Sequence, residues 1–388
     1  MQSPRVIAMI LALGTFSLGL DAYVMAGLIP LLQQAFAVSA AAAAQTVTAF
    51  TLAYAIGSPL LVALWPRHYQ RLALLSACLV FAIANVASAL ACSYSFLLIT
   101  RVVAGVSAGM FTAMSITTVT QLSGSGQQGK PIALVMMGMA AGTVVGVPVS
   151  LYIATDYGWQ AVLWLVAAIA MLCLLGLLLC VPALAPAARQ SLTAKLSVLA
   201  DKRVLSVQAV SLLAAVASLG LYSYLAAFIQ VIDAKASVTP WLWLWGVGGI
   251  AGSILAGRWL SRVAAVTFTL RIMSLLSLSL LSLPLLGSLW TPLMVLPLLI
   301  WGAVGWALQV PQNSELMRLR AAQGDGKNAV ALNGSALYLG SALGTAAGGL
   351  WLQYAGDAWQ LALLASAVAA VGAGVQWRAQ VRRKLLEC

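Results

Sequence analysis

Two charged residues lie inside apolar stretches of this sequence, and together they could move a proton. Asp21 lies in LGLDAYVMAGLIP (18–30), and no other charged residue occurs between Arg5 and Arg67. Arg101 is the charged residue of a second apolar stretch, 95–121. Burial raises the pKa of a carboxyl group and a nearby guanidinium lowers it, so a changing distance between Asp21 and Arg101 would load and release a proton. The alternative is a static ion pair that orients the two segments.

The composition shows which elements must position these residues. Of the 388 residues, 62% are hydrophobic and 7% are charged. A soluble domain carries roughly a quarter charged residues, and lipid is the solvent that accepts so much apolar surface. The first apolar run resembles a signal peptide, but it continues past the length of a signal core and many more runs follow it. We therefore predict an all-α membrane protein whose first run is a membrane helix.

Twelve apolar runs are long enough to span a membrane, and charged or turn-like breaks separate them. The predicted spans are approximately 6–32, 43–64, 72–91, 95–121, 131–154, 159–181, 206–232, 239–260, 268–289, 292–316, 328–353 and 359–377.

The distribution of charge predicts the orientation. A cytoplasmic N-terminus places every lysine and arginine except Lys235 and Arg101 on the cytoplasmic side, whereas Asp156, Asp233 and Asp357 lie outside. This asymmetry follows the positive-inside rule, so we predict that both termini are cytoplasmic. It also accounts for the net charge of +12 without a nucleic-acid partner.

An internal repeat predicts two halves. Gly57-Ser58 recurs as Gly252-Ser253, and Trp159-Gln160 recurs as Trp359-Gln360, at a nearly constant offset. Such a repeat is typical of transporters that rock two similar halves against each other. We predict two pseudo-symmetric six-helix halves and a linker between them, with the boundaries 1–182 (N-terminal half), 183–204 (cytoplasmic linker) and 205–388 (C-terminal half).

Three segments carry glycines and arginines at characteristic spacings. They are GSPLLVALWPRHYQR with Gly57, Arg67 and Arg71; RVVAGVSAG with Arg101, Gly105 and Gly109; and GMAAGTVVGVP with Gly138, Gly142, Gly146 and Pro148. On these residues the whole chain resembles the major facilitator superfamily. In particular it resembles the twelve-span drug:proton antiporters, including their arabinose- and sugar-efflux-like branch.

The resemblance implies a direction of transport and a central cavity. The glycine motif of span 5 is associated with export, although Ser150-Leu151 replaces the glycine pair that usually follows the proline. The loop after span 2 lacks the family's acidic residue and second glycine, which leaves the latching of the cytoplasmic gate open. The resemblance also implies that spans 1 and 4 line the cavity. Glycines four residues apart indicate either a hinge or close helix packing.

Helix geometry places Asp21 and Arg101 at similar depths. At 1.5 Å per residue, Asp21 lies roughly 22 Å from the cytoplasmic end of span 1, and Arg101 about 9 Å below the outer end of span 4. Glu315 is the other candidate for a proton carrier, but it precedes Arg318 by three residues, which favours a solvated intrahelical pair. Candidate substrate contacts in the cavity are Tyr23, Tyr54, Asn85, Gln230, Gln309, Asn333 and Tyr338.

The predicted function is proton-coupled efflux of small molecules such as sugars, nucleosides or drugs. The sequence has no G-x-x-x-x-G-K-[ST] motif, so we expect the proton gradient to supply the energy and expect no cofactor. His68 is the single histidine and no second acid accompanies Asp21, so we expect no enzyme, catalytic residue or metal site. Expected partners are the lipid bilayer, a small-molecule substrate and protons, for a monomer in the bacterial cytoplasmic (inner) membrane. The alternatives are a facilitator or importer of the same fold, or a non-transporting receptor.

Overall fold

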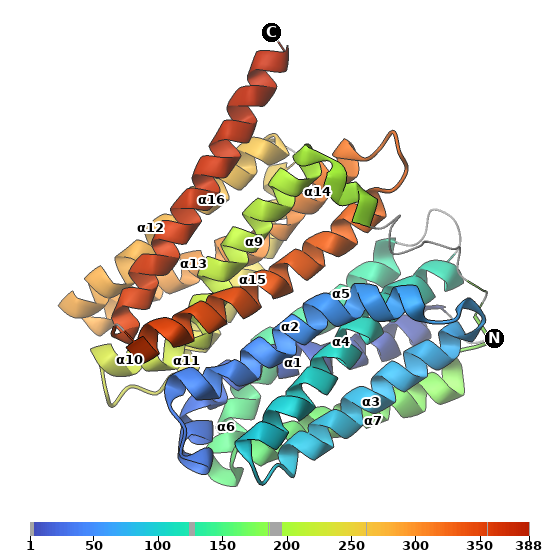
Figure 1. Ribbon diagram of the computed structural model, residues 1–388, viewed down its shortest axis with the longest axis horizontal. Coiled ribbons are helices and arrows are strands. Elements are labelled where there is room, and N and C mark those ends of the chain that lie inside the picture. The colour runs from blue at the N-terminus through green and yellow to red at the C-terminus, as the bar shows by residue number, and fades with distance from the viewer. Residues whose placement is uncertain are drawn as a thin grey trace. The chain divides into compact units, whose positions relative to one another are not determined.

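The computed structural model describes residues 4–123, 129–184, 186, 196–260, 262–354 and 356–387. Helices form the regular structure of these residues, and no strand occurs among them (Figure 1). An apolar segment in lipid must satisfy its backbone hydrogen bonds internally, and a helix does so within one segment. The predicted all-α class is therefore confirmed for the described residues.

The chain divides into two compact units, one formed by Met1–Ser39 with Gln45–Leu192 and the other by Ala40–Ala44 with Thr193–Cys388. The predicted boundaries at 182 and 205 stay a prediction, and residues 187–195 of the predicted linker lie outside the described residues. The helices up to residue 192 are α1 (Pro4–Phe36), α2 (Ala40–Leu64), η1 (Arg67–Tyr69), α3 (Gln70–Ala89), α4 (Tyr94–Leu122), α5 (Gly129–Ala141), the π-helical turn η2 (Gly142–Gly146), α6 (Val147–Tyr157) and α7 (Trp159–Cys180).

The second unit has its own set of helices. They are η3 (Ser197–Ala200), α9 (Lys202–Ser223), α10 (Leu225–Ile232), α11 (Thr239–Leu260), α12 (Ala265–Leu289), η4 (Thr291–Met294), α13 (Val295–Ala307), α14 (Gln309–Leu319), α15 (Gly326–Tyr354) and α16 (Ala358–Glu387). Within this unit α15 and α16 both pack on α9, and α13 packs on both α11 and α12.

Ten helices of the described chain are long and apolar enough to cross a membrane. Helices α11 and α15 occupy the two remaining predicted spans but are not among the ten. The structure thus supports a multi-pass membrane protein, whereas the count of twelve spans and the cytoplasmic location of both termini stay predictions.

Three predicted spans are not continuous α-helices. The span 131–154 contains the π turn η2 between α5 and α6. The span 206–232 breaks at Tyr224, whose N–H donates to Leu221 O and whose phenol donates to Thr345 O at 2.6 Å. The span 292–316 is divided at Leu308 between α13 and α14. Such breaks are tolerated within a span where neighbouring helices satisfy the polar groups that a break releases.

Local residues explain several helix ends. Ser93 caps α4, and its hydroxyl accepts a hydrogen bond from Phe96 N at 3.3 Å. Asp201 caps α9 in the same way, accepting from Arg203 N at 2.9 Å. Gly158 separates α6 from α7 at φ 79°, a left-handed conformation that glycine adopts without steric cost. The first two ends follow the known preference for Ser and Asp at helix N-termini.

Glycines bring α1 and the span-5 helices into backbone contact. A Cβ atom on Gly138 would lie 2.1 Å from Ala12 O, and one on Gly142 would lie 2.0 Å from Phe16 O. On the α1 side, a Cβ atom on Gly19 would lie 2.1 Å from Met139 O. The glycine motif of span 5 (Gly138, Gly142 and Gly146), called the glycine ladder from here on, therefore provides close helix packing. This is one of the two predicted roles, and the hinge role stays a prediction.

Charged residues join three helices at one end of the second unit. Arg320, just after α14, contacts Asp325 through Nε–Oδ1 at 2.8 Å and Nη2–Oδ2 at 2.7 Å, and its Nη1 lies 3.5 Å from Oδ2 of Asp201. The hydrogen bonds and charge of Arg320 lower the pKa of Asp325. At the same helix ends, Val198, Val204, Leu316 and Ala329 form a buried apolar cluster.

The packing role of Gly138 can be tested with Gly138→Ala. Alanine favours a helix by about 1 kcal/mol over glycine, but here its Cβ would collide with Ala12 O, and such overpacking costs about 1–3 kcal/mol. We expect a lower melting temperature in detergent. The control is Gly374→Ala in α16, where a Cβ would meet no atom within 4 Å. Equal melting temperatures for the two variants would contradict the packing role.

The Arg320–Asp325 pair predicts a pH dependence of stability. The folded-state pKa of Asp325 lies below its unfolded value, so the pair stabilises the fold above about pH 4 and loses this effect as the pH falls further. We expect Asp325→Asn to be less stable than the parent by about 1 kcal/mol at pH 7, and we expect this difference to shrink as the pH falls below about 4. Thermal unfolding in detergent across this range measures the difference. A difference that does not change with pH would contradict the assignment.

Candidate functional site: a buried ion pair

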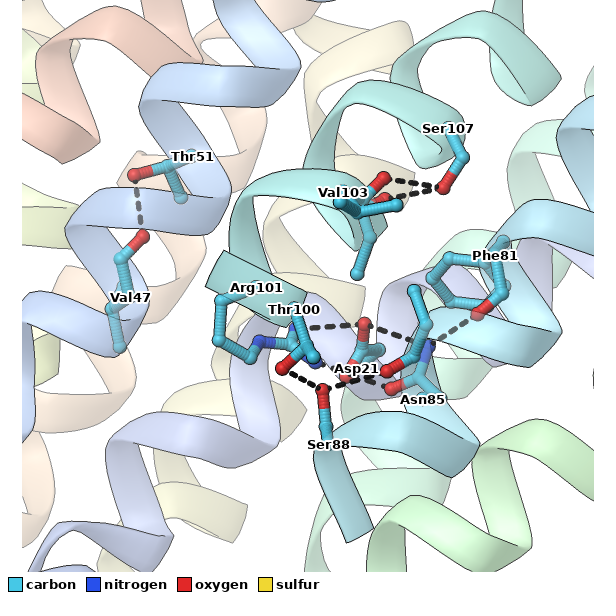
Figure 2. A network of polar contacts seen from close by, with 12 residues as sticks. Asp21, Val47, Thr51, Phe81, Asn85, Ser88, Thr100, Arg101, Val103 and Ser107 are labelled. Atoms are coloured by element: carbon cyan, nitrogen blue, oxygen red, sulfur yellow. Dashed lines mark hydrogen bonds and ion pairs between the residues drawn. The ribbon is translucent and has the colours of Figure 1, made fainter. Parts of the chain in front are cut away.

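Asp21 and Arg101 form an ion pair within the first unit. Asp21 lies on α1 and Arg101 on α4, and the distance from Arg101 Nη2 to Asp21 Oδ2 is 2.8 Å (Figure 2). The exposed fraction of both side chains is 0%. An unpaired charge at this depth in a membrane helix is very unfavourable, so each residue provides the partner that the other requires.

Asn85 on α3 completes the polar network around this pair. Its amide oxygen accepts a hydrogen bond from Arg101 Nη1 at 3.1 Å. Its amide nitrogen donates to Phe81 O at 3.0 Å and lies 3.5 Å from Asp21 Oδ2. Asn85 was predicted as a substrate contact, but its side chain is fully buried and both ends of its amide are engaged here. No sequence signal linked it to the ion pair.

Two further contacts fix the position of α4. The ring centroid of Phe50 on α2 lies 4.8 Å from Arg101 Cζ, within range of a cation–π interaction. Close packing holds that ring in place, because a Cβ atom on Gly105 would lie 2.2 Å from Phe50 O. Ser88 on α3 also donates to the Thr100 hydroxyl at 2.7 Å (Figure 2). The network therefore draws on α1, α2, α3 and α4.

Two polar atoms of the pair make no hydrogen bond within the described chain. They are Asp21 Oδ1 and Arg101 Nε, and both are buried. A carboxylate oxygen without a donor is the atom to which a proton can add without displacing an existing hydrogen bond. The ion pair therefore leaves one oxygen of Asp21 available for a proton.

The span-4 and loop motif residues have structural partners. Gly109 faces α2, and its carbonyl accepts a hydrogen bond from Ser58 at 3.1 Å. Gly57 lies against Val106, where an added Cβ would come within 2.9 Å of the valine side chain. Arg71 donates to Leu178 O at 3.0 Å near the end of α7. Arg67 begins η1, and its side chain lies outside the described part of the structure.

The remaining candidate substrate residues are distributed over both units. In the first unit, Tyr23 on α1 interacts with Tyr54 on α2. In the second unit, Asn333 on α15 is fully buried and donates to Asn313 at 3.1 Å. Gln230 on α10 is exposed, whereas Gln309 and Tyr338 are half-buried.

Glu315 differs from its prediction. It pairs with Arg318 within α14, through Nε–Oε2 at 2.9 Å, as the three-residue spacing indicated. However, the exposed fraction is 10% for the Glu315 side chain and 52% for that of Arg318. The predicted solvated pair is therefore wrong for Glu315, because helix packing in the second unit covers its carboxylate.

Sequence reasoning also missed an aromatic cluster in the second unit. Trp245 on α11 lies 4.5 Å from Tyr222 on α9, and 6.2 Å and 5.8 Å from Trp301 and Trp306 on α13, all measured between ring centroids. Trp301 donates to the Ser218 hydroxyl at 2.7 Å. The available signal was the position of these tryptophans within spans, away from the interfacial ends where tryptophan is usual.

Comparisons with known proteins agree with this architecture. The model of the Major Facilitator Superfamily matches residues 11–324. The inner membrane transport protein YdhP of Escherichia coli K12 is 28% identical over 342 residues and 87% of each chain. The chloramphenicol resistance protein of Streptomyces lividans is 30% identical over 260 residues, covering 64% of this chain and 65% of that protein. A D-xylose–proton symporter has the same fold at a TM-score of 0.80 and 17% identity, covering 97% and 98% of the two chains.

The ion pair predicts non-additive effects of mutation. Asp21→Asn leaves Arg101 buried without a counterion, and Arg101→Met leaves Asp21 buried without one. Removing one partner of a buried ion pair in this way costs about 3–5 kcal/mol of folding free energy. We expect each single variant to melt well below the parent in detergent. The double variant should be at least as stable as either single variant, because no buried charge remains. Additive losses in the double variant would show that the two residues do not interact.

Proposed function

Because the chain belongs to the Major Facilitator Superfamily and is thus a membrane transporter, we propose that it is a proton-coupled exporter of small molecules. It exchanges cytoplasmic substrate for an inward-moving proton by alternating access. In this proposal it is a monomer of the bacterial inner membrane, uses the proton gradient and no cofactor, and takes sugars, nucleosides or drugs as substrates.

The observation that carries the proposal is the fully buried Asp21–Arg101 pair, in which Asp21 Oδ1 makes no hydrogen bond within the described residues. Asp21 is the carboxylate that binds the proton, and Arg101 modulates its proton affinity. Addition of a proton to Oδ1 removes the negative charge and weakens the hold on Arg101. Conversely, separation of the two side chains during the transport cycle favours proton binding to Asp21, because it removes the guanidinium that favours the charged form. Proton binding and helix movement are therefore linked.

Burial of the pair is consistent with alternating access. In the present structure neither side chain is exposed, so a proton cannot exchange directly with water. The cycle must include a conformation in which Asp21 is hydrated. A ligand or proton shifts such an equilibrium only if it binds the two conformations with different affinity, and a pair that is buried in one and hydrated in the other meets this condition.

Two observations support export as the direction. The glycine ladder of span 5, which the superfamily's exporters share, packs directly on α1, the helix that carries Asp21. One relative is named as a chloramphenicol resistance protein. The alternative, an importer or facilitator, responds differently to a pH gradient, so the experiment below separates the two.

Transport in proteoliposomes tests the coupling. An acid lumen drives uptake by an antiporter as protons leave, an acid exterior drives uptake by a symporter, and a facilitator ignores both gradients. We expect an acid lumen to drive accumulation of at least one compound from a panel of pentoses, nucleosides and lipophilic cations. Asp21→Asn should lose this accumulation at least tenfold but retain substrate exchange without a gradient, because the neutral residue carries no proton.

The control for this variant is Asp156→Asn, which removes an exposed acid at the end of α6. It should transport like the parent. Gradient-driven accumulation by Asp21→Asn at the parental level would remove Asp21 from the coupling role. An active parent that ignores both gradients would refute proton coupling itself.

A further inference from the structure

We propose that Asn85 is the positioning residue of the proton site: it holds Arg101 in place when Asp21 binds a proton, and it thereby sets the pH at which the proton is loaded. Phe50 supports the same task through its ring, over which the guanidinium carbon of Arg101 lies. This inference rests on the proposed function, because it assigns roles within the Asp21–Arg101 site. It extends that function by adding residues of α2 and α3 to a pair contributed by α1 and α4.

The neighbours of Asn85 determine which end of its amide faces Arg101. Phe81 O accepts hydrogen bonds only, and the Asn85 amide nitrogen lies 3.0 Å from it. A guanidinium donates hydrogen bonds only, and the amide oxygen lies 3.1 Å from Arg101 Nη1. A flipped amide would face a donor with a donor and an acceptor with an acceptor. Asn85 is therefore held with its oxygen directed at Arg101.

The guanidinium is shared between one charged partner and two neutral ones. Its Nη2 contacts Asp21 and its Nη1 contacts the Asn85 oxygen (Figure 2). The Phe50 ring lies 4.8 Å from its Cζ. A proton on Asp21 abolishes the charge attraction but leaves the other two contacts intact. Because a buried cation without partners is strongly unfavourable, these neutral contacts make the protonated state accessible.

This arrangement predicts that two substitutions of Asn85 shift the pH of proton binding to Asp21 in opposite directions. In Asn85→Leu, Arg101 loses the 3.1 Å contact with the amide oxygen and depends more heavily on an ionised Asp21. This effect outweighs the loss of the longer 3.5 Å contact from the Asn85 amide nitrogen to Asp21, so the proton binds only at lower pH. In Asn85→Asp, a second carboxylate faces Arg101, so Asp21 no longer has to supply its counterion. The two neighbouring acids then repel each other and titrate together, and the first proton binds at higher pH. A residue that merely packs α3 against α4 would not produce shifts of opposite sign.

Other titratable groups on the surrounding helices have different partners or are exposed. Tyr23 on α1 interacts with Tyr54 on α2, and the Cys173 thiol on α7 interacts with that of Cys78 on α3. Tyr94 at the start of α4 lies near Phe36, with 6.4 Å between the ring centroids. Arg71 on α3 donates to Leu178 O, and Cys180 at the end of α7 is half-buried. The exposed groups are Arg5 on α1, His68 and Tyr69 on η1, Lys130 on α5, and Tyr152, Asp156 and Tyr157 on α6. Among the charged residues of the described chain, Arg101 is the one in contact with Asp21.

Infrared spectroscopy can follow the proton on Asp21 without a known substrate. The carbonyl stretch of a protonated carboxyl group that is present in the parent and absent in Asp21→Asn reports on this residue. Its amplitude is measured against pH in the purified full-length protein for the parent, Asn85→Leu, Asn85→Asp and Phe50→Leu. We expect the midpoint to fall by about one pH unit in Asn85→Leu, to fall by less in Phe50→Leu and to rise by about one unit or more in Asn85→Asp.

Ser88→Ala is the matched control. It removes the hydrogen bond between α3 and α4 from Ser88 to Thr100 but no contact of the ion pair, so its midpoint should equal that of the parent. Phe50→Leu provides an independent test if Asn85→Leu does not fold. A midpoint that stays unchanged in the Asn85 and Phe50 variants, or moves in the same direction in both Asn85 variants, would overturn the inference.

Failure of this inference can be distinguished from failure of the proposed function. Gradient-driven transport by the parent, together with unshifted midpoints in the variants, rejects the role of Asn85 and leaves proton coupling intact. Parental transport that ignores the gradient rejects proton coupling, whatever the midpoints show. Shifted midpoints accompanied by equal shifts in the pH optimum of transport support both.

Discussion

A charge that leaves water for the interior of a membrane protein must find an opposite charge or return to water, and this constraint organises the first unit. Asp21 and Arg101 meet at 2.8 Å on helices that are far apart in sequence, and neither is exposed. Their contact requires α1 and α4 to be neighbouring helices at this depth. Glycines bring other helices of the unit close to these two: Gly105 lets α4 reach the backbone of α2, and Gly142 lets the span-5 helices reach the backbone of α1.

The network combines rigid and adaptable parts. Backbone-to-backbone packing at Gly19, Gly105, Gly138 and Gly142 leaves little room for adjustment, because a Cβ added at any of these four would overlap a carbonyl oxygen. The ion pair, by contrast, depends on a charge that a single proton can remove. A structure in which fixed helices surround a removable charge can convert proton binding into a change in the preferred helix arrangement. Asn85 and Phe50 are neutral, so their contacts with Arg101 persist through that change.

The sequence predicted well how deep a residue lies along its span, but it predicted poorly which neighbouring helix that residue faces. The residue count along each span placed Asp21 and Arg101 at similar depths, because the rise per residue of a helix is constant. Asn85 was predicted as a substrate contact because its depth alone did not show which neighbour its amide faces. In the same way, the spacing of Glu315 and Arg318 predicted their pairing but not the burial of Glu315, which depends on the surrounding helices. The break at Tyr224 involves neither proline nor glycine, so no local signal marked it.

The π turn at Gly142–Gly146 has a consequence for the register of span 5. A π turn contains one residue more than an α turn, so every residue after it is displaced by one position from the face that an uninterrupted helix would give it. The four-residue spacing of Gly138, Gly142 and Gly146 therefore cannot be extrapolated into α6. If Gly142–Gly146 formed an α turn with no residue removed, α6 would be rotated by about 100° from its present orientation. Leu151 would then leave its contact with Gly27, so the length of this segment, as well as its composition, is part of the fit to α1.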